Sequence, residues 1–462
     1  MPSSPWLGIV LVLVALGAIF VGLRIVQARY DLNSEATRKG VHVLMGGVTL
    51  TFPGLFDAFW PVALLGGLAV GAFLALRTVP VLQKTLGAVL HSVGRHSYGE
   101  IYYAAAVVLL FGLSGGDPVL YGVPILLLGL ADPAAALAGM YYGQTLYRTS
   151  EGVKSGEGSA SFFLVAFFCV HIPVLLATDT GRLESLLIAL IAGFLVMLLE
   201  AIAWRGLDNL FVPIGGYALL ATHMTMGASE LAARLVAIAA LFALASVWHR
   251  ETTLDRSATF AAALVGVVTW TIGGWQWLLA PAALYFGYTV LWPSSARVDE
   301  TTSGPPTLHT VHNVLGVASV GLGWLFLSVA AAQWSLLYPY TLAYAGYLGL
   351  IGVERLRSYP HPFSTGRILG GSTLKSCGAL FLPLLFVDGL GIHVLPLAGG
   401  LVGVVLLTAF LYMQWPRVFE EAPSEFLTHA RRALLVTATS ALGVPILLLS
   451  ERLRAPAEWG LL

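Results

Sequence analysis

Long apolar runs without a single charged residue recur throughout this chain of 462 residues. Four of them approach or reach the roughly 20 residues that a helix needs to cross a bilayer: Trp6–Leu23, Ile101–Gly116, Ser185–Leu199 and Leu395–Gln414. Charged residues make up only 10% of the chain, whereas a soluble domain carries about 25%. Transmembrane strands would alternate apolar and polar residues, and these runs do not. The sequence therefore predicts an all-α, polytopic integral membrane protein.

The topology follows from the placement of the basic residues. Hydropathy and turn signals predict about 14–16 transmembrane segments. Alternating these segments places most Lys and Arg residues on one side, while Arg182, Arg234, Arg452 and Arg454 oppose the pattern. Because positively charged loops stay in the cytoplasm, we expect the N-terminus outside and these loops inside, in the cell inner membrane. Trp6–Leu23 lacks a preceding basic region and a cleavage site, which predicts a retained first helix.

A short polar stretch at Met224–Leu231 divides the chain into two predicted membrane domains, residues 1–225 and 226–462. Polar motifs are dense in the first domain and sparse in the second. The formal net charge is zero, so nothing points to a nucleic-acid partner. Cys169 and Cys377 lie in or beside apolar runs and are interpreted as packing residues.

The first polar cluster lies at the start of an apolar run. Glu35, Arg38, Lys39 and His42 share one stripe if the segment is helical, because their spacing is i, i+3, i+4 and i+7. One interpretation is a membrane-end helix whose long side chains reach the interface and form an internal ion pair. The other is that the histidine and basic pair hold a phosphate-bearing ligand.

The second cluster, Gly94–Glu100, is a polar loop that enters a helix. Taken alone, it is typical of a solvated turn. Its predicted position on the cytoplasmic side favours a role for Glu100 in the same site as the first cluster.

The third cluster begins with Asp132, which lies within apolar sequence. An ionisable group there costs at least about 2.5 kcal/mol and needs a partner or a function. Gly139 and Gly143 suit either a helix-packing face or a ligand site. In the segment Lys154–Ser159, the lysine supplies a charge, and the glycines let backbone N–H groups approach a ligand at a helix N-terminus. These features predict a phosphate-binding site.

The fourth cluster pairs Glu200 with Asp208 and Asn209. Asp208 is also a fitting helix cap. The alternative is that Glu200, Asp208 and Asp132 supply oxygen ligands to Mg²⁺, which needs one or two carboxylates beside nucleotide phosphates. The chain has no GxxxxGK[ST] loop, no GxGxxG after a strand and no kinase-type catalytic loop, which excludes the familiar soluble nucleotide folds.

Residues 30–222, approximately, resemble the dolichol kinase and phytol kinase family. The residues that carry this resemblance are Glu35, Arg38, Lys39, His42, Gly99, Glu100, Asp132, Pro133, Gly139, Gly143, Lys154–Ser159, Glu200, Asp208, Asn209 and Pro213. Enzymes of this family transfer the γ-phosphoryl group of CTP to the hydroxyl group of a membrane-dissolved polyprenol. The resemblance implies the same activity here, with CTP as donor, an isoprenoid alcohol as acceptor and the bilayer as surroundings.

Phosphoryl transfer needs mainly positioning and charge neutralisation, and this requirement suggests a role for each cluster. Phosphate oxygens would meet Lys154, Arg38 or Lys39, with Gly139, Gly143, Ser155, Gly156, Gly158 and Ser159 completing the nucleotide site. Asp132 and Asp208 would hold Mg²⁺. Glu200, Glu157 or His42 would orient or deprotonate the alcohol, and the sequence leaves this choice open.

Two other functions fit the same residues. A cytidylyltransferase would join CMP to a lipid phosphate and release pyrophosphate. A transporter would suit the many helices and the intramembrane carboxylates of Asp132 and Glu200.

The second half is similar, more faintly, to the membrane family that contains phytyl-phosphate kinases. The similar segments are Ala261–Trp275, Thr310–Asn313 and Gly370–Gly378. The acidic stretch expected between the last two is reduced to little beyond Glu354. The residues therefore give little support for a second kinase activity. An equally good interpretation is a diverged helical module that holds lipid or packs against the first half of the chain.

Overall fold

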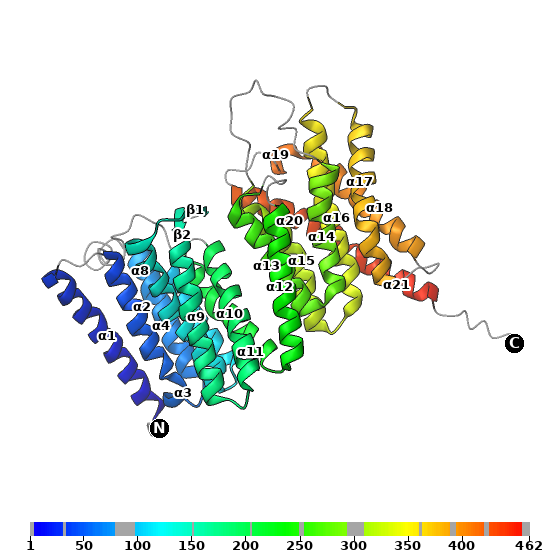
Figure 1. Ribbon diagram of the computed structural model, residues 1–462. Coiled ribbons are helices and arrows are strands. Elements are labelled where there is room, and N and C mark those ends of the chain that lie inside the picture. Colours follow the sequence, from blue (N-terminus) through cyan, green and yellow to red (C-terminus); the bar gives the residue numbers. More distant parts are fainter. Residues whose placement is uncertain are drawn as a thin grey trace. The chain divides into compact units, whose positions relative to one another are not determined.

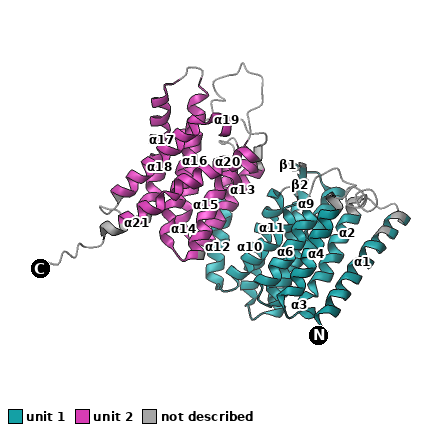
Figure 2. Ribbon diagram, turned by 180° about the vertical axis from the view of Figure 1, so that it is seen from behind, with its two compact units in different colours: residues 1–241 teal, residues 242–462 magenta. Residues whose placement is uncertain are grey.

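The computed structural model describes residues 4–30, 34–78, 98–149, 152–203, 206–248, 254–292, 309–359, 363–388, 394–419 and 425–454. These segments form helices almost throughout (Figure 1). The chain divides into two compact units, residues 1–241 and residues 242–462 (Figure 2). The boundary falls within α12, and the separate roles expected of the two halves stay predictions.

The predicted all-α polytopic membrane fold is confirmed. Ten helices in the described ranges are long and apolar enough to cross a membrane, and three shorter apolar helices accompany them. Trp6–Leu23 lies within one of the ten. Many large apolar side chains on these helices face outward, including Val14, Leu176 and Leu374. A lipid environment is what allows such side chains to remain exposed.

Unit 1 contains one short hairpin among its helices. Its elements are α1 (Pro5–Tyr30), α2 (Ser34–Leu50), α3 (Phe52–Leu55), α4 (Phe59–Thr78), α6 (Gly99–Leu113), α7 (Pro118–Leu126), η2 (Leu127–Ala131), α8 (Asp132–Tyr142), β1 (Leu146–Thr149), β2 (Gly152–Ser155), α9 (Gly156–Ala177), α10 (Arg182–Ile202), α11 (Asp208–His223) and α12 (Ala228–Trp248). Most of α10 is buried, and it packs against α9 and α11.

Unit 2 is built around the enclosed helix α16. Its elements are α13 (Arg256–Gly273), α14 (Trp275–Leu291), α15 (Val311–Ala331), η5 (Trp334–Leu336), α16 (Leu337–Arg357), α17 (Thr365–Asp388), α18 (Val394–Gln414), α19 (Pro416–Phe419), α20 (Glu425–Ala441) and α21 (Gly443–Arg454). Helices α14, α15, α17, α18 and α20 all pack against α16. This arrangement explains why nearly every side chain in the first four turns of α16 is buried.

A break in helical regularity precedes Asp132. The segment η2 is a π-helix that joins α7 to α8, and Pro133 stands immediately after Asp132. Proline has no backbone N–H to donate, so a regular α-helix cannot continue unchanged through this point. Such π-helical turns often accompany functional sites. Here the turn places Asp132 in the interior of unit 1, and Asp132 is only 4% exposed.

Candidate active site

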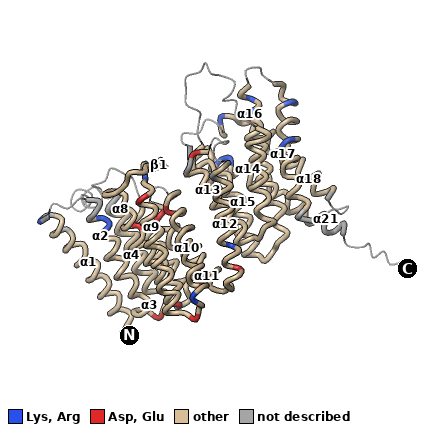
Figure 3. The backbone as a smooth tube through the Cα atoms, viewed as in Figure 1, with Lys and Arg blue, Asp and Glu red and all other residues tan. Residues whose placement is uncertain are grey.

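The described charged residues of unit 1 lie at the two ends of its bundle (Figure 3). One end carries the start of α2, the β1–β2 hairpin and the loop between α10 and α11. Most of the site residues predicted from sequence lie at this end because successive helices run in opposite directions. We call it the hairpin end of unit 1.

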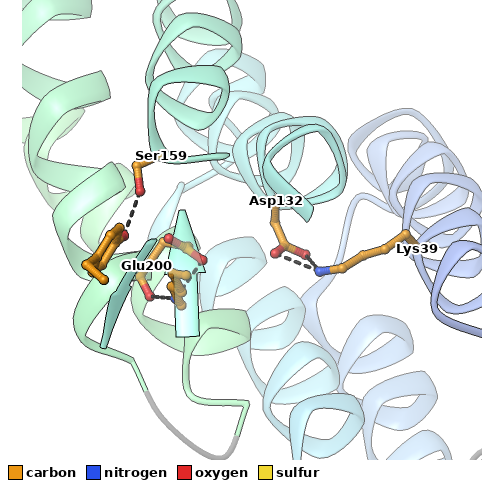
Figure 4. Close-up of polar contacts among 6 residues, drawn as sticks. Lys39, Asp132, Ser159 and Glu200 are labelled. Carbon is orange, nitrogen blue, oxygen red and sulfur yellow. Dashed lines mark hydrogen bonds and ion pairs between the residues drawn. The ribbon is translucent and has the colours of Figure 1, made fainter. Parts of the chain in front are cut away.

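Lys39 and Asp132 form a buried ion pair at the hairpin end. The ammonium Nζ lies 2.8 Å from Oδ1 and 2.6 Å from Oδ2 of the carboxylate (Figure 4). The two side chains are only 6% and 5% exposed. A close crossing of α2 over η2 brings the pair together, since a Cβ on Gly46 would lie 3.4 Å from the Cα of Gly129. Asp132 therefore has the partner that an intramembrane carboxylate requires.

A second ion pair joins the hairpin to α10. The Nζ of Lys154 lies 2.7 Å from Oε1 of Glu200 and donates a second hydrogen bond to the Glu200 carbonyl oxygen, also at 2.7 Å. Burial opposes the charge of Lys154, but the Glu200 carboxylate outweighs it, and the pKa of Lys154 is raised above its ordinary value. Lys154 therefore carries a positive charge throughout the neutral range.

Asp208 links the two ion pairs electrostatically. It is the first residue of α11, and its carboxylate interacts with Asp132, Lys39 and Lys154. The capping role considered for Asp208 is absent among the described residues, because no side chain caps this helix start. Its neighbour Asn209 is 3% exposed, and the side-chain oxygen Oδ1 has no hydrogen-bond partner in the described part of the chain.

The segment Lys154–Ser159 forms the end of the hairpin and the start of α9. Strand β2 pairs antiparallel with β1, so Tyr147 lies opposite Lys154. Ser155 is the N-cap of α9, and its Oγ accepts a hydrogen bond from the Gly158 N–H at 3.1 Å. The Glu157 carboxylate accepts hydrogen bonds from the backbone N–H groups of Gln144 and Thr145. Glu157 thus fastens the hairpin base.

Gly139 in α8, Gly143 directly after it and Gly158 in α9 lie where the start of α9 packs closely against α8. A Cβ on Gly158 would lie 2.9 Å from the Ala135 carbonyl oxygen, and a Cβ on Gly143 would lie 2.9 Å from the Ser155 Cβ. A Cβ on Gly139 would lie 3.2 Å from the Ser155 Oγ. The helix-packing interpretation of these glycines therefore holds in the structure, while their contact with a nucleotide stays a prediction.

The remaining predicted residues take varied positions. Arg38 is exposed and interacts electrostatically with Asp132, Asp208 and His42. Glu100 is in the first turn of α6 and interacts with His42. The side chain of Glu35 and residues 94–97 of the second cluster lie outside the described residues.

Two side-chain contacts near these residues were not predicted from the sequence. The hydroxyl of Tyr147 is 2.7 Å from Oγ of Ser159, which ties β1 to the first turn of α9 (Figure 4). Tyr103 meets the ring of His42 edge-on, with ring centroids 5.8 Å apart. No sequence pattern could have predicted either pairing.

The oxygen atoms at the hairpin end determine which residues could bind Mg²⁺. No group of three or more His, Cys, Asp or Glu side chains in the described ranges is placed to hold a metal. Magnesium needs fewer protein ligands than that when nucleotide phosphates supply the rest. Asp208 and the unpartnered Oδ1 of Asn209 fit this requirement. Asp132 would need to be released by Lys39 before it could serve as the predicted second carboxylate.

Several polar residues of the second-half motifs have partners, whereas Oγ1 of Thr373 and Oγ of Ser376 are buried with no hydrogen-bond partner in the described part of the chain. Glu354 accepts one hydrogen bond from the Tyr412 hydroxyl and forms a 2.7 Å ion pair with Arg432. Asn313 completes a capping box with Thr310 at the start of α15. Lys375 donates to the Leu291 carbonyl oxygen at 3.0 Å. The contacts of Glu354 join α16 to α18 and α20, and the contact of Lys375 joins α17 to the end of α14.

Comparison with known proteins gives one informative relative. A phytol kinase from Synechocystis sp. is 32% identical to this chain over 221 residues, which are 47% of this chain and 91% of that protein. No family model matches the chain, and no solved structure matches it.

Proposed function

This chain belongs to the phytol kinase family, and we propose that it transfers the γ-phosphoryl group of CTP to the hydroxyl group of a membrane isoprenoid alcohol. The observation that carries the proposal is the hairpin end of unit 1. Two ion pairs, Lys39–Asp132 and Lys154–Glu200, and the Asp208 carboxylate gather there on a bundle of apolar helices. Such a site can receive a water-soluble phosphate donor and a lipid-soluble acceptor together.

The basic residues would neutralise the phosphates of the nucleotide. Arg38 is exposed, and Lys154 is 26% exposed, so both can reach a ligand from water. Lys39 is enclosed with Asp132 and would act deeper in the site. The N-terminus of α9 adds the backbone N–H groups of Gly156 and Gly158, whose dipoles favour an anion. Phosphoryl transfer depends chiefly on this positioning and charge neutralisation.

Asp208 and Asn209 would hold Mg²⁺ at the start of α11. A bound magnesium ion would neutralise charge on the transferred phosphoryl group. Asp132 would fix Lys39, because the carboxylate accepts both of the hydrogen bonds that the ammonium makes to it. Removing the Asp208 carboxylate should therefore lower the affinity for Mg²⁺ more than removing Asp132 does.

The hairpin end would face the cytoplasm, where nucleoside triphosphates are available. Charged residues of both signs also lie at the opposite end of unit 1 (Figure 3). The positive-inside rule counts Lys and Arg residues only, and Arg38, Lys39, Arg148 and Lys154 at the hairpin end outnumber Arg182 and Arg234, which oppose the pattern. This bias supports the orientation and an N-terminus outside. The test uses chains in which Cys169 and Cys377 are replaced by serine and a single cysteine replaces Leu146 or Asp57. These two cysteines should react with a membrane-impermeant thiol reagent from opposite sides of the membrane.

The test is transfer of γ-labelled phosphate to lipid by the purified chain in lipid nanodiscs. CTP and ATP are each incubated with phytol and with a longer prenol. We expect label in the lipid monophosphate, with CTP as the better donor. Release of labelled pyrophosphate without lipid label would indicate a cytidylyltransferase instead. Uptake of substrate into vesicles without nucleotide would indicate a transporter.

A further inference from the structure

His42 carries an unsatisfied polar atom in the interior of unit 1. The residue is 8% exposed, and Nδ1 has no hydrogen-bond partner in the described part of the chain. Leaving a buried polar atom unpaired costs about 1–3 kcal/mol, so such an atom requires an explanation. A ligand that supplies the missing hydrogen bond is one such explanation.

The fold holds His42 beside the phosphate-binding residues. His42 precedes Gly46 by four residues on α2, and Asp132 follows Gly129 by three residues after η2. Because Gly46 and Gly129 mark the close crossing of these antiparallel segments, His42 and Asp132 lie on the same side of it. The electrostatic interaction between the two side chains agrees with this placement.

The ring of His42 has a fixed neighbour. Tyr103 of α6 contacts it edge-on, and the hydroxyl of Tyr103 is 3.0 Å from Oγ1 of Thr49. Thr49 lies on α2 itself, two turns beyond His42. The same tyrosine therefore bridges the helix on both sides of the Gly46 crossing and limits rotation of the imidazole.

The competing bases are already engaged. The Glu157 carboxylate accepts backbone hydrogen bonds from the hairpin base, and the Glu200 carboxylate pairs with Lys154. Asp132 is enclosed with Lys39. Among the sequence candidates for deprotonating the alcohol, His42 alone has a proton-accepting atom, Nδ1, that is buried and without a partner in the described residues.

The depth of His42 suits a lipid alcohol. Lys39 and His42 are three residues apart on α2, which corresponds to about 4.5 Å along the helix axis. His42 lies on the apolar side of Lys39, next to Val43 and Leu44, which are 37% and 44% exposed on the bundle surface. A hydroxyl group arriving from the bilayer would thus reach His42 before it reaches the phosphate-binding cations.

We propose that Nδ1 of His42 binds the hydroxyl group of the acceptor alcohol and takes its proton, an inference that rests on the proposed kinase function. The alcohol oxygen forms a bond to the γ-phosphorus of the nucleoside triphosphate as the O–H proton passes to Nδ1. The bond from that phosphorus to the β–γ bridging oxygen breaks, and its electron pair leaves with the nucleoside diphosphate. His42 then returns the proton to water.

The experiment measures transfer of γ-labelled phosphate by the full chain in nanodiscs, with His42→Asn and His42→Gln variants. The asparagine amide can hydrogen-bond near the Nδ1 position but cannot act as a base. The matched control is His171→Gln, because His171 is also embedded in a helix but bonds Ser185 through Nδ1 at 3.0 Å. Each protein is assayed with an ordinary saturated prenol and with an analogue whose hydroxyl is acidified by fluorine on the neighbouring carbon.

We expect kcat for the ordinary alcohol to fall at least about 100-fold in both His42 variants. The KM for CTP should stay within about threefold of wild type, because phosphate binding rests on other residues. The kcat for the fluorinated alcohol should fall much less, because its more acidic hydroxyl group depends less on a general base. The His171 variant should keep wild-type kcat.

Three results would overturn the inference, and they have different meanings. Label transfer at the wild-type rate by both His42 variants would exclude His42 as the general base. Equal losses for both alcohols, together with weaker CTP binding, would assign His42 a structural role only. Failure of the wild-type chain to label any alcohol would remove the kinase function itself, which separates that failure from an error about His42.

Discussion

The buried pair of Lys39 and Asp132 allows a quantitative test of unit 1. Removing one member of a buried ion pair strands the other and costs about 3–5 kcal/mol, whereas replacing both with apolar residues is often neutral. With side chains 6% and 5% exposed, the pair meets the condition for this cost. The variants are Lys39→Met, Asp132→Leu and the combination of both.

We expect each single variant to lower the melting temperature by about 6–20 °C, taking about 2–4 °C per kcal/mol for a unit of this size. The double variant should recover most of that loss, because no charge is then left unpaired. The assay is thermal unfolding in nanodiscs, monitored by tryptophan fluorescence. All three variants should lose prenol phosphorylation, which uncouples stability from activity in the double variant.

A double variant no more stable than the weaker single variant would refute the reasoning. That result would mean that the two charges are solvated separately or serve different partners. A coupling energy near zero in the double-mutant cycle would lead to the same conclusion.

Three further predictions concern the hairpin and α9. Gly158→Ala should destabilise unit 1 by about 1–3 kcal/mol in thermal unfolding, because its Cβ would lie 2.9 Å from the Ala135 carbonyl oxygen. Glu157→Gln should speed hydrogen exchange at the hairpin base while leaving exchange in α10 unchanged, since the carboxylate accepts backbone hydrogen bonds only there. Because the pKa of Lys154 is raised above about 10.5, its stabilising pairing with Glu200 is fully present below that pH and is lost only as pH rises through the raised value. Melting curves of wild type and Lys154→Met should therefore differ by a constant amount between pH 7 and pH 9, and a difference that shrinks in this interval would contradict the assignment.

The helices of this fold could be predicted because bilayer insertion leaves so few alternatives. Charge-free runs such as Ser185–Leu199 must satisfy their backbone groups internally, so composition alone selects helices. The short strands β1 and β2 are different, because they lie at the polar end where water can satisfy the backbone. The four residues Leu146–Thr149 do not alternate apolar and polar side chains and are too few to separate a strand from a loop.

The identity of the site residues could be predicted better than their pairing. Spacing on one helix placed Lys39 and His42 on a common stripe. Nothing in the sequence could match Lys39 with Asp132, 93 residues away, or Lys154 with Glu200, 46 residues away. Helix periodicity specifies which face a residue occupies, but the partner of that face is decided by tertiary packing.

Pairing also separates residues that the sequence left equivalent. Glu157, Glu200 and His42 were equal candidates for the base, since each lies in a motif and can accept a proton. The structure occupies the two carboxylates with hydrogen bonds and leaves Nδ1 of His42 buried and unpartnered among the described residues. A catalytic base must be available to the substrate. The hydrogen bonds of the two carboxylates therefore support the choice of His42 as much as the position of the histidine itself does.

The order of groups along the bundle then matches the order in which two unlike substrates must meet. Lys154 keeps its charge at the hairpin end, where a hydrated triphosphate can arrive. Lys39 lies deeper in its ion pair with Asp132, and His42 lies nearly one turn deeper again on α2. A charge placed at the depth of His42 would be costly without a partner, whereas a neutral imidazole is tolerated there. Burial therefore keeps the imidazole neutral, which is the state in which Nδ1 can accept a proton, and the Asp132 carboxylate offsets part of the cost of the charge that this transfer creates.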